Sequence, residues 1–114
     1  MSCDMRDVPV GPEMLLHRAC PFPIVGMRFR SSSRVVYDTS AVRLRIGLPG
    51  EAALVDVALA EDVTDPADPS WYVTLTAEQL DIDLASRAEY VFVDADGLPM
   101  LYGSAPMVDH PRAV

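Results

Sequence analysis

The sequence of 114 residues predicts a single all-β domain: an antiparallel immunoglobulin-like β-sandwich or small barrel of seven to eight short strands, with an extended N-terminal arm. Short stretches alternate apolar and polar residues with a period of two, which is typical of half-buried strands. Turn signals recur every ~8–12 residues, as in β-sandwiches. No amphipathic helix longer than two turns is found. Half of the residues are hydrophobic, enough for one core but not for two.

The first 23 residues are expected to form the arm, residues 24–110 the sandwich domain and residues 111–114 a C-terminal tail. Prolines punctuate the arm, and its segment 13–18 fits either one helical turn or a short strand, too short to be a stable helix alone. We expect the arm to be poorly ordered in the isolated protein and to become ordered on a neighbouring subunit. Its only apolar cluster is Met14, Leu15 and Leu16, which should carry that contact.

Three strands are expected in the first half of the sandwich. Their inward-facing residues are Val25, Met27 and Phe29 in the first, Val42, Leu44 and Ile46 in the second, and Val55, Val57 and Leu59 in the third. A turn with two glycines and a proline, residues 47–50, separates the last two. Residues 61–69, acidic and containing two prolines, are expected to form a loop.

The second half of the sandwich begins with Trp71, Val73 and Leu75, which alternate in phase and predict a buried face. The segment Thr76–Gln79 then matches a capping box that opens one helical turn. Tyr90 and Phe92 predict a second inward-facing stripe in a strand over residues 88–93. The segment Asp94–Gly97 predicts a hairpin turn with Gly97 in the left-handed conformation. Residues 98–102 are expected to form the second strand of this hairpin, and residues 104–108 to end the domain.

The formal net charge of −8 argues against a nucleic-acid partner, since such proteins need a basic surface. The charge is uneven, because residues 18–45 hold six arginines and one acid. If the strands that carry them pair, the sandwich has one basic outer face. That face fits either a solvated surface with cross-strand ion pairs or a docking surface for an acidic partner. Its residues are Arg28, Arg30, Arg43 and Arg45.

No catalytic constellation, cofactor motif or metal-ligand spacing is found, so we expect a protein that is not an enzyme and has no cofactor. The Asp94–Gly97 segment lacks the further ligands of a calcium loop. Cys3 and Cys20 fit two free thiols in a reducing compartment, or a disulfide that fastens the arm. The chain starts without the features of a signal peptide, and its longest uncharged run is too short to span a membrane, so no membrane partner is expected.

The order of these features resembles the N-terminal β-sandwich module of phage tail-fibre and upper-baseplate proteins. The resemblance covers residues 24–108. It rests on a turn and an alternating strand (residues 37–46), the segment Val73–Gln79, the Tyr90–Gly97 strand and hairpin, and a final strand near Gly103. Fibre proteins usually continue into a coiled coil or a receptor-binding domain, and this sequence carries an N-terminal arm in front.

The resemblance implies a non-enzymatic virion structural protein of a tailed bacteriophage. It would act as an adaptor, attachment or decoration protein, assembled in the host cytoplasm and present in several copies of a symmetric particle. Its partners would be other virion proteins: capsid, tail, baseplate or fibre subunits. The alternative is a carbohydrate- or ligand-binding sandwich, for which Tyr72 and Tyr102 are the best exposed contacts.

Overall fold

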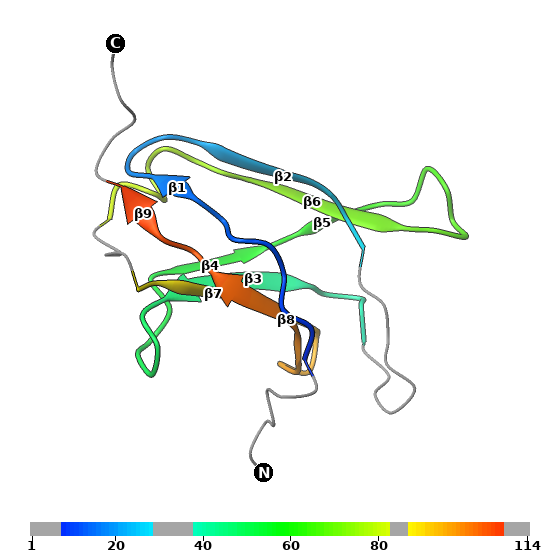
Figure 1. Ribbon diagram of the computed structural model, residues 1–114. Coiled ribbons are helices and arrows are strands. Elements are labelled where there is room, and N and C mark those ends of the chain that lie inside the picture. The colour runs from blue at the N-terminus through cyan, green and yellow to red at the C-terminus, as the bar shows by residue number, and fades with distance from the viewer. Residues whose placement is uncertain (1–7, 29–37, 83–86, 109–114) are drawn as a thin grey trace.

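The computed structural model describes residues 8–28, 38–82 and 87–108, and these form two facing β-sheets and one small two-stranded sheet, with no helix (Figure 1). This confirms the predicted all-β class and the β-sandwich. The described residues hold nine strands, of which two have only two residues each.

The four-stranded sheet has the order β4 (Val55–Ala58), β3 (Arg43–Gly47), β7 (Glu89–Val93) and β8 (Pro99–Ser104). All of its neighbours are antiparallel. The predicted alternation in β3 is confirmed, because Leu44 and Ile46 are fully buried.

The three-stranded sheet has the order β2 (Phe22–Met27), β6 (Ser70–Leu75) and β5 (Ala60–Asp62). Only Leu59 separates β4 from β5, so the chain passes from one sheet directly into the other along this side of the sandwich. The expected acidic loop therefore begins later than predicted: its first two residues, Glu61 and Asp62, pair with β6.

The core lies between the two sheets and is built from the residues that the period-two pattern selected. Trp71 and Leu75 come from one sheet, and Tyr90 and Phe92 from the other. The two aromatic rings of β7 pack edge to face, with centroids 5.7 Å apart. Both predicted stripes are thus confirmed as parts of one core.

The phase predicted for the first strand is wrong at Val25 and right at Met27, which packs against the core, and Phe29 lies outside the described residues. Ile24 is buried, whereas Val25 is 79% exposed. The register between β2 and β6 shifts between Ile24 and Met27, and Gly26 has a φ of 72° inside that interval. A bulge adds a residue to one strand and so interrupts the alternation of its faces.

The predicted turn chemistry is present. Thr76 and Gln79 form the reciprocal capping box: the Gln79 amide donates to Thr76 Oγ1 at 3.1 Å, and the Thr76 amide donates to Gln79 Oε1 at 2.8 Å. Gly97 has a φ of 83° in the hairpin between β7 and β8. A hydrogen bond from its amide to the Asp94 carbonyl, 3.0 Å long, closes that turn.

Residues 9–18 of the arm, here called the arm strand, lie beside β8 and β9 (Met107–Val108) (Figure 1). Within it, β1 (Leu16–His17) pairs with β9 in the parallel direction. Further along, Val10 forms a parallel bridge with Tyr102 of β8. The boundary expected at residue 23 therefore does not separate the arm from the sandwich, because the arm strand extends a sheet edge and Phe22 already belongs to β2.

Tyr90 links the arm strand to the core. Its hydroxyl donates a 2.7 Å hydrogen bond to the carbonyl of Pro12. The arm strand has one residue more than β8 at this point, since Gly11 bonds to Tyr102 and Met14 to Ser104. The phenol thus satisfies a carbonyl that the bulge removes from the ladder. Gly103 makes room for the ring, because a Cβ there would lie 2.8–2.9 Å from Tyr90.

Candidate binding surfaces

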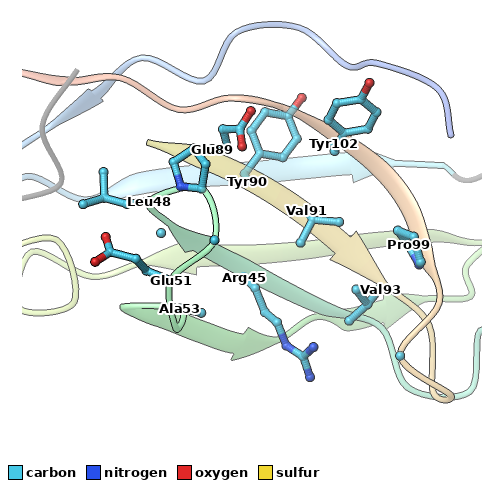
Figure 2. A pocket seen from close by; sticks show the side chains of 14 residues that line it. Arg45, Leu48, Glu51, Ala53, Glu89, Tyr90, Val91, Val93, Pro99 and Tyr102 are labelled. Carbon is cyan, nitrogen blue, oxygen red and sulfur yellow. The ribbon is translucent and has the colours of Figure 1, made fainter. Parts of the chain in front are cut away.

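A hollow of about 450 Å³ lies over the outer face of the four-stranded sheet. Val91 and Val93 of β7 line it, with Pro99 and Tyr102 of β8 on one side. The loop between β3 and β4 lines the opposite side, where Figure 2 shows Leu48, Glu51 and Ala53. A glycine with a φ of 78°, Gly50, lets this loop turn.

The charges around this hollow have both signs. Glu51 and Glu89 are exposed carboxylates, and Arg45 is the cation among the lining residues. Asp56 lies 3.4 Å from the Arg45 Nε and 2.7 Å from the Arg43 Nε, so the two arginines share one carboxylate. With apolar side chains, tyrosine rings and charges of both signs, the hollow can hold a small amphiphilic group by stacking and hydrogen bonds.

A second hollow, of about 230 Å³, lies between the arm strand and β2. Pro12 and Met14 line one side, Phe22 and Ile24 the other, and Phe92 also contributes. It is more apolar than the first hollow and lies on the side of the sandwich opposite the β4–β5 crossing.

The predicted contact cluster of the arm is divided by the fold. Met14 is 8% exposed and Leu16 is fully buried, and both belong to the core, whereas Leu15 is 46% exposed. Alternate residues of a strand face opposite sides, which explains the division. Of the three, Leu15 alone remains available to another molecule while the arm strand is in place.

The predicted basic face does not form as one surface. Arg43 and Arg45 lie on β3, but β2, which precedes Arg28, pairs with β6 in the other sheet. Arg28 instead forms a 2.9 Å ion pair with Asp68. Arg30 lies outside the described residues. The cross-strand ion pairs to Asp56 fit the alternative of a solvated, charge-paired face.

The two tyrosines of the carbohydrate hypothesis lie on different sheets. Tyr72 is 47% exposed on β6, next to the inward-facing Trp71. Tyr102 lies on β8 and lines the larger hollow. They therefore cannot form one stacking platform, and of the two only Tyr102 lines that hollow.

The role of Asp94 was missed by sequence reasoning. Its side chain is 3% exposed and accepts three backbone hydrogen bonds: from Asp96 at 2.9 Å and Leu98 at 2.8 Å within its own turn, and from Asp38 at 3.0 Å. The Asp38 carbonyl accepts a bond from Ala95 in return. The carboxylate therefore ties two turns together, which the spacing Asp94–Gly97 alone could not indicate.

Two exposed aspartates cap turns in a simpler way. A hydrogen bond from the Ser40 hydroxyl, and then one from its amide, lowers the pKa of Asp38. Thr64 acts on Asp62 in the same manner and lowers its pKa. For Tyr90, burial raises the pKa of the phenol.

Within residues 8–28, 38–82 and 87–108, no three His, Cys, Asp or Glu side chains gather in a way that could hold a metal ion. Cys20 is a free thiol there, and Cys3 lies outside these ranges. Among these same residues, no helix is long and apolar enough to cross a membrane.

Comparison with known proteins gave no match to any family model, to any curated protein or to any solved structure.

Proposed function

We propose that this chain is a non-enzymatic structural protein of a tailed-phage virion, an adaptor, attachment or decoration protein that docks on a larger head or tail assembly. Its partners are other virion proteins, and it is present in several copies of a symmetric particle. The proposal combines the resemblance of the sequence to tail-fibre and baseplate sandwich modules with the surface of the arm strand.

The segments that carry the resemblance lie in well-defined elements. Residues 42–46 lead into and form most of β3. Val73–Gln79 continues from β6 into the capping box, and Tyr90–Gly97 forms most of β7 and its hairpin. Each motif is a strand followed or preceded by its turn, as the resemblance implies. This agreement supports the proposal through the fold only.

The observation that carries the proposal is that three exposed apolar side chains lie on the arm strand and on the strand β9 with which it pairs. Val10 is 68% exposed, Leu15 46% and Val108 40%. Val10 pairs with Tyr102, and Val108 pairs with His17, so all three belong to the arm strand and the strands that it joins. Apolar side chains gathered at one edge are typical of protein–protein contact surfaces.

Mass spectrometry of purified particles from the phage that encodes the chain tests the proposal, and we expect the chain among the particle proteins. Leu15→Asp should prevent incorporation without changing the melting temperature. Leu54→Asp is a matched control, because Leu54 is similarly exposed, at 54%, in the loop between β3 and β4. Particles that lack the wild-type chain, or that take up Leu15→Asp normally, contradict the proposal.

The hollow beside Tyr102 favours a second candidate function, the binding of a carbohydrate or similar ligand. The Tyr102 phenol, beside Glu89, Glu51 and apolar side chains, offers both stacking and hydrogen bonds. A glycan array tests this candidate. Tyr102→Ala should remove any binding found, whereas Tyr72→Ala, on the other sheet, should preserve it.

A further inference from the structure

The arm strand is joined to β2 by a short turn with a strained residue. Ala19 has a φ of 58°, the left-handed conformation, and it is the one non-glycine residue with positive φ among the described residues. Alanine in this conformation is disfavoured, because its Cβ approaches the following carbonyl oxygen. Cys20 precedes Pro21, and a residue before proline prefers an extended backbone. We call residues 18–21 the hinge.

We propose that the arm strand exchanges between two copies of this chain, each copy placing its arm strand against β8 and β9 of the other. In the exchanged form the hinge is extended, Ala19 leaves the left-handed region, and the arm runs on from β2 instead of folding back. Strained, short hinges favour exchange of this kind.

When an arm strand leaves β8 and β9, the arm strand of a second copy takes its place, because this edge is already complementary to the sequence of the arm strand. Met14 and Leu16 enter the core, and Tyr90 donates to the Pro12 carbonyl. Amides of the arm strand bond to Tyr102, Ser104, Pro106 and Val108, at 2.8–2.9 Å. An arm from another copy forms the same contacts, so exchange leaves this interface unchanged.

The contacts that exchange removes belong to the hinge. Among the described residues they include the hydrogen bonds from Ala19 to the Leu80 carbonyl, 2.9 Å, and from Cys20 to the His17 carbonyl, 3.1 Å. The ion pair between Arg18 and Asp81, at 3.7 Å, is exposed and contributes little. The balance between the two forms is therefore set by hinge strain and by chain concentration.

Cross-linking on the purified chain tests the exchange directly, and it does not depend on the virion proposal. Val10 and Tyr102 are paired across the arm strand and β8, so V10C/Y102C in a C3S/C20S background places two cysteines at bridging distance. Oxidation of the dimer fraction should give covalent dimers on a non-reducing gel. The control A60C/Y72C, paired between β5 and β6, should link only within one chain.

The hinge variants sharpen the test by light scattering at low and high chain concentration. Ala19→Gly, which relieves the strain of the folded-back hinge, should weaken dimerisation about tenfold for each hinge. Ala19→Val should strengthen it, because a β-branched residue is less tolerant of positive φ. A chain that is monomeric at every concentration even with Ala19→Val overturns the proposal. So does a dimer fraction of V10C/Y102C in which the engineered disulfide forms only within one chain.

Discussion

β6 and the arm strand each insert two large apolar side chains into the same core, but they are held differently. Trp71 and Leu75 belong to a central strand with neighbours on both sides, β2 and β5. Met14 and Leu16 belong to a strand at an edge, joined by one hinge. Burial of a side chain therefore does not by itself tell whether its strand is needed for the fold or can leave as a unit.

The largest effect is expected in β6. Trp71→Ala removes a side chain that is 5% exposed and should lower the free energy of unfolding by about 3–5 kcal/mol. Many small domains do not tolerate such a loss. Chemical denaturation measures the effect. A variant that unfolds like the wild type but loses a binding activity would place Trp71 in a binding site instead.

Leu16→Ala and Leu75→Ala compare the two strands directly, since both residues are fully buried. Each truncation removes about 2–5 kcal/mol of stabilisation where its strand is docked. We expect Leu75→Ala to destabilise the whole domain, and Leu16→Ala to remove hydrogen-exchange protection mainly from residues 10–18. Equal loss of protection throughout the sandwich in both variants would show that the arm strand cannot leave alone. Leu15→Ala, at an exposed position, should change neither the stability of the domain nor the hydrogen-exchange protection of residues 10–18.

The hairpin between β7 and β8 leads into the strand beside which the arm strand lies. Asp94→Ala leaves three backbone amides without their acceptor and should cost about 1–3 kcal/mol in the free energy of unfolding. Thermal melting measures it, with Asp96→Ala as the exposed control. Unchanged stability of Asp94→Ala would mean that water replaces the carboxylate. Added calcium should not raise the melting temperature.

Tyr90→Phe removes the hydrogen bond from the Tyr90 hydroxyl to the Pro12 carbonyl in the bulge of the arm strand. The Pro12 carbonyl loses its partner while the ring keeps its place, so the loss should be about 1 kcal/mol. Amide hydrogen exchange at Met14, next to the bulge, should accelerate more than amide hydrogen exchange in β7. If the amides of β7 accelerate equally, the hydroxyl stabilises the whole sheet.

The smallest effect concerns the exposed turn at Asp38. Because the folded state lowers its pKa, Asp38 stabilises the fold above its unfolded pKa, and this contribution is lost as the pH falls through the folded pKa. Ser40→Ala removes the hydroxyl bond and should bring the pKa back towards its ordinary value. NMR titration of the Asp38 carboxyl carbon measures this pKa in the wild type and in Ser40→Ala. If the pKa is the same in both, the Ser40 hydroxyl is not the cause of its lowering.

The strands predicted best from the sequence are those with one face against the core and the other face away from it. β3, β6 and β7 each have one face on the core, and their alternation is therefore visible. The bulge between Ile24 and Met27 hid the phase of the first half of β2, since one added residue reverses the faces, and only Met27 beyond it was placed correctly. Turns with local chemistry, the capping box and Gly97, were also predictable from a few residues.

The surfaces could not be predicted in the same way, because they depend on which strands pair. Arg28 and Arg43 belong to different sheets, and no local pattern states this. The arm strand lacks a regular alternation, since prolines and a bulge interrupt it, and its partner β8 is about 90 residues away. Asp94 was missed for the same reason, because one of its donors is the amide of Asp38.

The parallel pairing of the arm strand with β8 and β9 also has a consequence for synthesis. Val10 leaves the ribosome about 90 residues before Tyr102. At typical elongation rates the arm waits roughly 5–20 s for its own partner strand. A nascent chain on a polysome therefore presents an unpaired arm beside neighbours that have just been completed. In the exchange proposed above, a completed copy whose own arm strand has left β8 and β9 would have the first opportunity to capture it.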